Sequence, residues 1–374
     1  VFAGPYCTYQ LALLGAQVIK IEPIGGEGTR FGGARRDLAA QAMGLAYCTQ
    51  NAQKDAIAMD LKAPGSVEQV LALAAEADIF VQNFRPGVAQ RLGLGEQALV
   101  QTNPQIIYCS ISAYGGEGPI GHRPAYDHVV QAMSGIMQTT GTDEMGPVKV
   151  GAPYVDYATG LNAAFAVMAA LRERDRTGQS QSVDISMLDT ALNLMANNLV
   201  NTATTGEDLP KLGNEAASRA PSSGCFNCKD GQLLMLAANN ERQFSDLCDV
   251  LGHPEWALDA RWASVLARAQ NQKALRAEFV AAFMTDSAAA WEVRLDARGV
   301  PASRVRSLSQ VLAEGQPEAR GLLQSLQVGP DKQTVKLPAI GFRLNGDSLK
   351  PTQAPKLPGQ DNLRWLSELG DEPM

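Results

Sequence analysis

The first 190 residues alternate between short apolar runs and amphipathic segments. A brief apolar run bounded by turn residues is typical of a buried strand. Such runs predict strands at Val18–Ile21, Ile79–Val81, Gln105–Ile111 and Val183–Met187. In the segments between them the apolar residues recur every three or four positions, which predicts helices. These helices are expected at Thr8–Leu14, Ser66–Ala77, Tyr157–Arg174 and Leu188–Leu199.

Two of the helices carry recognisable end signals. Ser66 and Gln69 have the spacing of a capping box, in which each side chain satisfies a backbone N–H at the helix start. The helix Tyr157–Arg174 has the strongest pattern in the chain and ends in a basic turn followed by Gly178. Basic residues suit the negative helix end, and glycine suits the left-handed residue that follows it.

Strand–helix alternation of this kind predicts an α/β fold with a parallel sheet covered by helices. In such sheets the ligand crevice lies beyond the carboxyl ends of the strands. Polar, aromatic and basic side chains follow several of the expected strands, so they are candidate site groups: Glu22, Asn83, Phe84, Arg85 and Ser112.

The pattern changes after about residue 200. Residues 201–224 are polar and rich in turn formers, which predicts a linker. A different unit is expected over 225–320, with two strands joined at the turn 229–231 and helices at Glu241–Leu251, Asn271–Thr285 and Ala288–Ala297. Residues 336–361 are Pro-rich and are expected to run extended along the surface, and a short helix is expected over 362–369.

Composition and charge exclude several classes of protein. Apolar residues make up 45% of the chain and charged residues 19%, which is ordinary for a globular protein. The net charge of −7 argues against a nucleic-acid binder. No apolar run approaches the roughly 20 residues of a membrane-spanning helix, and no secretory pattern opens the chain. Since the sequence begins at Val1 just before a turn, we expect a strand to precede it.

The six scattered cysteines indicate a reducing, cytoplasmic compartment. Cys225 and Cys228 have CxxC spacing but lack a second ligand pair, so no metal site is predicted. The glycines at 25–28 do not form GxGxxG or a phosphate-binding loop, and neither HExxH nor GxSxG occurs. These absences weigh against a metalloenzyme, a serine hydrolase and a Rossmann dehydrogenase.

Asp156 stands at the start of the strongest helix, after the segment 151–155. One interpretation is an N-cap, because Asp accepts the free backbone N–H bonds at a helix start. The other is chemical, because the positive helix end favours an ionised carboxylate, which could attack an acyl carbonyl and form a covalent intermediate. From the residues alone both interpretations stay open.

Two further segments combine polar and aromatic groups. Asn83, Phe84 and Arg85, followed by Arg91, form either a solvated loop or a nucleotide pocket in which the ring stacks on a base and the cation meets phosphate. The segment 123–135 contains Tyr126, Asp127 and His128 before an amphipathic stretch. A histidine in such a position is more often packed or solvated than catalytic.

Taken together and in this order, the segments resemble the class III CoA-transferases, the group that includes formyl-CoA transferase and the carnitine CoA-transferases. The resemblance runs almost end to end. It rests on Ala3-Gly4-Pro5, Leu14–Pro23, Asp60-Leu61-Lys62, Ala77–Gly87, Asn103-Pro104, Tyr126-Asp127, Ala132–Gly135, Arg176–Gln179 and Leu188-Asp189.

The resemblance implies an interlocked homodimer with a Rossmann-like large domain built from both chain ends. On this basis we expect residues 1–200 and 321–374 to form the large domain and 225–320 the small one. It also implies an enzyme that moves CoA from an acyl-CoA to a carboxylic acid. CoA is then a substrate, and no resident cofactor, metal, nucleic acid or membrane is expected.

By position, Asp156 matches the nucleophilic aspartate of the family, which forms an aspartyl acyl anhydride and then an aspartyl-CoA thioester. Tyr126 and Asp127 match an active-site pair beside the acyl group. Residues that match positions lining the CoA site are Phe2, Ala3, Met59, Lys62, Asn83, Phe84 and Arg91.

Departures from the family pattern leave two alternatives open. Racemases of this fold carry His where this chain has Tyr126, so their proton-shuttling pair is incomplete here. Asp55 stands where the family often has Arg, which removes an expected cation and allows a non-catalytic CoA-binding protein. No polyglycine run occurs between residues 200 and 230, which argues against formyl or oxalyl substrates.

Overall fold

The computed structural model describes residues 2–366. The chain divides into two compact units. The large unit comprises residues 1–137, 149–209 and 315–374, and the small unit comprises residues 138–148 and 210–314. Residues 138–148 thus join the small unit although they lie far from it in sequence, which the residue pattern did not indicate.

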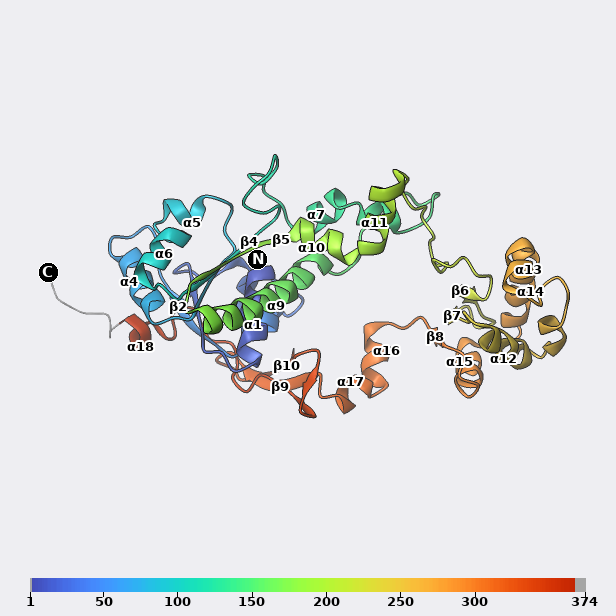
Figure 1. Ribbon diagram of the computed structural model, residues 1–374. Coiled ribbons are helices and arrows are strands. Elements are labelled where there is room, and N and C mark those ends of the chain that lie inside the picture. The colour runs from blue at the N-terminus through green and yellow to red at the C-terminus, as the bar shows by residue number, and fades with distance from the viewer. Residues whose placement is uncertain (1, 367–374) are drawn as a thin grey trace. The chain divides into compact units, whose positions relative to one another are not determined.

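Among the described residues of the large unit, five strands pair in parallel, as the α/β pattern predicts. They form two sheets rather than the single sheet that we expected. β1 (Val18–Glu22) pairs with β2 (Lys54–Ala58). β4 (Ile107–Ser112) lies between β3 (Ile79–Gln82) and β5 (Gln181–Ser186); β2, β4 and β5 are labelled in Figure 1.

Helices of the large unit confirm the expected pattern, with shifted ends. They are α1 (Ala3–Leu13), α2 (Arg36–Ala40), α3 (Leu45–Asn51), α4 (Ser66–Ala75), α5 (Val88–Arg91), α6 (Glu96–Thr102), α7 (Asp127–Met133), α9 (Tyr154–Thr177), α10 (Met187–Leu194), α11 (Ala196–Thr205), α17 (Gln316–Ala319) and α18 (Asn362–Leu366). The short helix α8 (Ile136–Thr139) crosses the boundary between the two units. Short 3-10 turns occur at η1 (Gly28–Phe31) and, in the small unit, at η2 (Pro254–Ala257).

Two details of the predicted helices are wrong, and a third cannot be compared. Gly65, not a serine side chain, occupies the N-cap of α4, so the capping box does not form. The helix expected over 188–199 is two helices, α10 and α11, because Met195 leaves the helical backbone conformation between them. Residues 367–369 of the last expected helix lie outside the described residues.

α1 and α9 lie side by side in the large unit (Figure 1). They approach closely at Gly160, where an added Cβ would lie 2.8 Å from the carbonyl oxygen of Ala3 and 3.0 Å from the Tyr6 ring. Gly4 is equally tight against the side chain of Asn83. The Gly160 contact holds the start of α1 against the first turns of α9, and the Gly4 contact holds it against the end of β3.

A buried ion pair joins the end of β1 to η1. Arg30 donates from Nε to Glu22 Oε2 at 2.8 Å and forms a second bond with the same carboxylate, and neither side chain is appreciably exposed. The guanidinium also lies over the Tyr47 ring. Glu22 was expected to face a ligand crevice, but its carboxylate is bonded by Arg30 and by the backbone N–H of Glu27. Removing one partner of such a buried pair costs about 3–5 kcal/mol.

The C-terminal part of the large unit is more structured than its prolines suggest. β9 (Leu323–Val328) and β10 (Gln333–Pro338) form a hairpin, and β11 (Arg343–Leu344) pairs with β12 (Asp347–Ser348). Leu337 and Ile340 are buried in the core beside Tyr9, whose hydroxyl donates to Pro338. The expectation of an extended surface segment over 336–361 is therefore wrong in its first part, because apolar residues there complete a core.

Asp55 is part of an ion cluster. Its carboxylate accepts bonds from Lys356 at 2.6 Å, Arg364 at 3.2 Å and the Trp365 indole at 3.0 Å. Asp361 bonds both Lys356 and the backbone N–H of β2. Asp55, which stands where the family often has Arg, thus holds residues 356–365 against β2.

The small unit packs helices against an antiparallel sheet of β6 (Ser223–Asn227), β7 (Leu233–Ala237) and β8 (Ala302–Arg304). Its helices are α12 (Glu241–Leu251), α13 (Val265–Gln270), α14 (Gln272–Phe283), α15 (Ala288–Asp296) and α16 (Leu308–Ala313). The predicted strand pair and three helices are confirmed. The expected linker 201–224 is helical up to Thr205 and enters β6 at Ser223.

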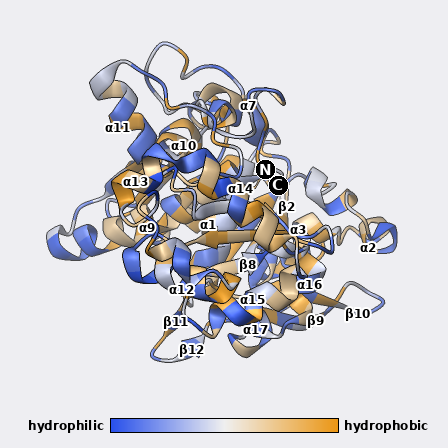
Figure 2. Cartoon of the chain, turned by 90° about the vertical axis from the view of Figure 1, so that its right-hand side faces the viewer, coloured by the Kyte–Doolittle hydropathy of each residue, from blue (hydrophilic) through white to orange (hydrophobic). Residues whose placement is uncertain are grey.

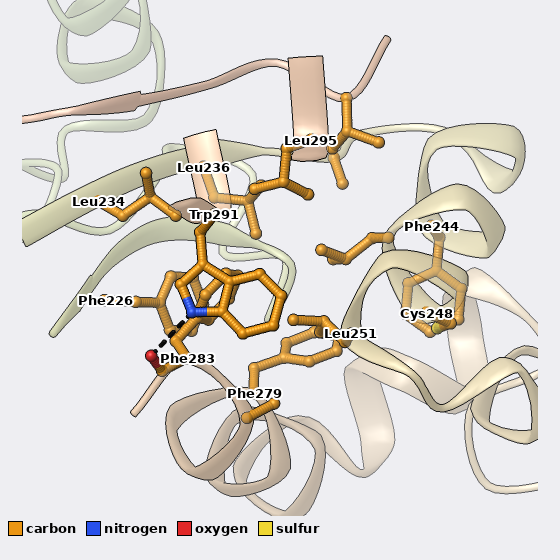
Figure 3. Packing of buried hydrophobic residues seen from close by; sticks show 14 of the residues in the cluster. Phe226, Leu234, Leu236, Phe244, Cys248, Leu251, Phe279, Phe283, Trp291 and Leu295 are labelled. Carbon is orange, nitrogen blue, oxygen red and sulfur yellow. Dashed lines mark hydrogen bonds between the residues drawn. The ribbon is translucent and has the colours of Figure 1, made fainter. Parts of the chain in front are cut away.

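Aromatic residues fill the core of the small unit (Figure 3). Phe226 and Trp291 both pack against Phe283, and the Trp291 indole donates to the Phe283 carbonyl at 3.0 Å. Hydrophilic and hydrophobic residues alternate along the helices, as expected for helices with one buried face (Figure 2). In α12 the buried face comprises Phe244, Leu247, Cys248 and Leu251.

Candidate active site

Asp156 lies in the first turn of α9, but it is not the N-cap. α9 begins at Tyr154, and Pro153 occupies the cap position without a side-chain bond. The capping group comes from another helix: Asp127 Oδ2 accepts the backbone N–H of Val155 at 2.8 Å and that of Asp156 at 3.0 Å. The capping interpretation of Asp156 is therefore wrong, and its own carboxylate is left for other contacts.

Gln131 extends this arrangement to the loop before α9. Its amide nitrogen donates to Asp127 Oδ1 at 2.5 Å, and its amide oxygen accepts the N–H of Val150 at 2.9 Å. Asp127 and Gln131 are both buried on α7. One turn of α7 thus fixes both the loop that precedes α9 and the backbone of Asp156.

The carboxylate of Asp156 lines a hollow of about 330 Å³, which we call the Asp156 pocket. Its walls combine aromatic rings, two carboxylates, one lysine and the backbone before α9. They are formed by Phe2, Tyr126, Asp127, His128, Lys149, Gly151, Ala152, Pro153 and Asp156. No hydrogen bond from residues 2–366 reaches the Asp156 carboxylate oxygens, so an incoming ligand can meet them.

Burial sets the charge state of Asp156. Only 8% of the residue is exposed. Desolvation, with a smaller contribution from the negative charge of Asp127, raises the pKa of Asp156 from 3.8 to about 6. The helix end was expected to favour the ionised form; burial outweighs it, yet the carboxylate remains mostly ionised at pH 7.

Because its pKa is raised, Asp156 is expected to lower the unfolding free energy of the protein by an amount that depends on pH. Below about pH 4 the carboxyl is protonated in both the folded and the unfolded chain. Between about pH 4 and pH 6 the unfolded chain has ionised Asp156 while the folded chain still holds its proton, so the unfolding free energy falls until the buried carboxyl itself ionises near pH 6. Relative to Asp156→Asn, the wild type should lose on the order of 2 kcal/mol of unfolding free energy between pH 4 and pH 7. Denaturant titrations of both proteins at the two pH values measure this, and a constant difference would contradict it.

Tyr126 and Phe2 lie on the wall of the Asp156 pocket. Tyr126 is 62% exposed and stacks on the His128 ring, with 6.4 Å between ring centroids. Phe2 stacks on Tyr157, one residue after Asp156. Tyr126, Asp127 and Asp156 were expected together from the sequence, and the structure brings them to one pocket.

The residues expected to bind CoA divide into two groups. Asn83 donates to the Ile111 carbonyl and accepts from the Gly4 N–H, so both ends of its amide are engaged within the protein. Ala3 and Met59 are buried in apolar cores. Lys62, Phe84 and Arg91 are exposed, and Phe2 is half-buried on the wall of the Asp156 pocket.

Two residues of the Asp156 pocket region were missed by sequence reasoning. Lys149 lines the pocket, and Gln131 ties its loop to Asp127. Gln131 falls four residues after Asp127, so the two share a helix face, and this spacing could have indicated the pair. Nothing in the residue pattern indicates that Lys149 lies beside Asp156.

Within residues 2–366, no cluster of three or more His, Cys, Asp or Glu side chains is placed to hold a metal ion. No helix in the same range is long and apolar enough to cross a membrane.

Comparison with known proteins identifies the family. The family model for CoA-transferase family III matches residues 1–362. The chain belongs to this family. Succinyl-CoA:glutarate CoA-transferase from Mus musculus is 34% identical over 370 residues, covering 99% of this chain and 84% of that protein. Acetyl-CoA:oxalate CoA-transferase from Acetobacter aceti is 35% identical over 325 residues, covering 86% and 82%.

The fold of this CoA-transferase matches a solved relative. The crystal structure of a CAIB/BAIF family protein from Brucella suis is 30% identical, covers 99% of this chain and 96% of that chain, and gives a TM-score of 0.85.

Proposed function

We propose that the chain transfers CoA from an acyl-CoA thioester to a carboxylic acid through a covalent intermediate on Asp156. The observation that carries the proposal is the carboxylate itself. It is buried, mostly ionised at pH 7, without a hydrogen-bond donor among residues 2–366, and open to the Asp156 pocket. A desolvated carboxylate is a stronger nucleophile than one held by hydrogen bonds.

The reaction balances in four steps. An Asp156 oxygen attacks the thioester carbonyl carbon, the C–S bond breaks, and CoA leaves as thiolate with an aspartyl acyl anhydride left behind. The thiolate then attacks the Asp156 carbonyl carbon and releases the acyl group as a free carboxylate, which leaves an aspartyl-CoA thioester. The acceptor carboxylate attacks this thioester and expels the thiolate again. Finally the thiolate attacks the acceptor's carbonyl carbon and restores Asp156.

Asp127 and Gln131 act as positioning residues in this proposal. Their bonds to Asp156, Val155 and Val150 are made to backbone atoms, so they hold the nucleophile rather than react. Tyr126 and Phe2 would cover the acyl group. For CoA we propose contacts from Lys62, Phe84 and Arg91, whereas Asn83, Ala3 and Met59 would shape the site through the backbone and packing that they support.

We also propose that the chain is a homodimer. α9 carries an exposed apolar stripe of Leu161, Phe165 and Met168, and the Phe165 side chain is 74% exposed. These residues recur at helical spacing on one face, and a second copy of the chain would cover them. Light scattering coupled to size-exclusion chromatography should give twice the chain mass.

A reducing, cytoplasmic location is also part of the proposal, and the six free cysteines fit it.

The acyl groups belong to the proposal as well. The relatives above are named for succinyl, glutarate, acetyl and oxalate groups, and we propose short dicarboxylic acids as acceptors here. Oxalate is the least expected of these, since the polyglycine run typical of enzymes for oxalyl groups is absent from 200–230.

Hydrogen exchange separates the proposal from racemisation of an acyl-CoA. The protein is incubated with an acyl-CoA in deuterated water, with and without an acceptor acid. We expect CoA to move only when the acid is present, with no deuterium at the α carbon. Deuterium incorporation without an acceptor would favour the racemase, and CoA binding with neither reaction would favour a non-catalytic protein.

A further inference from the structure

Lys149 is the lysine of the Asp156 pocket, and no acidic side chain of residues 2–366 pairs with it. Its Nζ donates to the carbonyl oxygens of Val150 at 3.2 Å and Gly151 at 3.4 Å. Among residues 2–366 no carboxylate lies within ion-pair distance of this ammonium. An ammonium group carries three donors and a full charge, so two long bonds to carbonyls leave it able to bind an anion.

The backbone that carries Lys149 is fixed relative to the nucleophile. The next residue, Val150, donates its N–H to Gln131, and Gln131 is bonded to Asp127, which caps the turn containing Asp156. The ammonium and the Asp156 carboxylate are therefore anchored to the same turn of α7. Two groups held in this way can recognise two ends of one ligand.

Two other anion-binding groups of this pocket are already engaged. The N–H groups of Val155 and Asp156, which would otherwise attract an anion to the start of α9, are bonded to Asp127. The carboxylates of Asp127 and Asp156 repel a negatively charged acyl group. Tyr126 and His128 also line the pocket, but Lys149 brings its one ammonium group, so it is the strongest partner there for a ligand's own carboxylate.

We propose that Lys149 binds the distal carboxylate of an acyl group whose thioester carbonyl lies at Asp156, and so selects ω-carboxyacyl thioesters over neutral ones. This inference rests on the proposed function and names its substrate class. A neutral acyl chain of the same length leaves the ammonium unpaired and gains nothing from it.

Succinyl-CoA and butyryl-CoA test this directly, because the two acyl groups have four carbons each and differ at the distal carbon. kcat/KM for each donor is measured in the wild type and in Lys149→Met. With succinyl-CoA we expect a loss of roughly 10- to 100-fold, the range for a hydrogen bond to a charged group. With butyryl-CoA we expect a change of less than about threefold. Lys149→Arg should retain most of the succinyl activity.

Two controls accompany the comparison. Lys273, an exposed lysine on α14 in the small unit, is replaced in Lys273→Met, which removes the same charge from a residue that does not line the pocket and should leave the activity with both donors unchanged. Retained butyryl activity in Lys149→Met shows that this variant is folded.

Three results would overturn the inference: an equal loss for both donors, which would indicate that Lys149 binds CoA itself; no loss for either donor; or a wild type that prefers butyryl-CoA. Each of these leaves the role of Asp156 standing. The proposed function is tested separately: it fails if CoA transfer persists in the Asp156→Ala variant.

Discussion

Replacing Asp156 by alanine should lower the rate of CoA transfer by at least roughly 10⁴-fold, which is the scale seen when a covalent nucleophile is removed. The variant keeps the cap of α9, since Asp127 bonds the backbone N–H of residue 156 and not its side chain. The loss should therefore appear in kcat, with CoA binding retained. Steady-state transfer and CoA titration measure the two effects.

Stability provides the control for this variant. Because burial raises the pKa of the Asp156 carboxyl to about 6, the residue costs stability at neutral pH, and its removal should not unfold the protein. Asp156→Ala that melts near the wild-type temperature but transfers CoA at the wild-type rate would refute the nucleophile assignment. For the wild type, kcat/KM should decline as the pH falls below 6, where Asp156 takes up a proton.

Asp127→Ala is expected to have the second largest effect. It removes the carboxylate that accepts two backbone N–H groups at the start of α9 and one bond from Gln131. Loss of a cap costs about 1–2 kcal/mol of stability. Displacement of the nucleophile by about 1 Å costs about 100-fold in rate. Chemical unfolding and transfer kinetics should show both effects in one variant.

Asp127→Asn and Gln131→Ala separate positioning from proton transfer. Asparagine can still accept from the two N–H groups, so Asp127→Asn should recover much of the rate. It also removes a negative charge near Asp156, so the acidic limb of the pH profile should move to lower pH. Gln131→Ala keeps the cap and loses the bond to the 149–153 loop, and a smaller loss is expected. If asparagine is as inactive as alanine, Asp127 takes part in the chemistry itself.

Much of this fold could be predicted from the sequence, because the spacing of apolar residues and the positions of turn-forming residues determine local structure. α12 begins and ends at its predicted residues, Glu241 and Leu251. The strands β1, β3, β4 and β5 lie within two residues of the apolar runs that predict them. Gly178 adopts the left-handed conformation that its place after α9 predicts.

What the sequence could not indicate depends on contacts between distant residues. Glu22 follows a strand as a site residue would, yet its carboxylate is bonded by Arg30 and the Glu27 N–H. The sequence suggested that Asp55 removes a cation expected near the CoA site. In the structure its carboxylate pairs with Lys356 and Arg364 from the far end of the chain. The cap of α9 comes from Asp127 because tertiary packing brings α7 to its start. A local pattern contains none of these partners.

The central claim is that the acyl group and then CoA become bound to Asp156. The most direct measurement is mass spectrometry of the peptide containing Asp156 after the protein is mixed with acyl-CoA and quenched with borohydride or hydroxylamine. We predict that Asp156 alone is modified, that the modification requires the thioester, and that added acceptor acid removes it. CoA transfer at full rate with Asp156 unmodified at every time point would contradict the account.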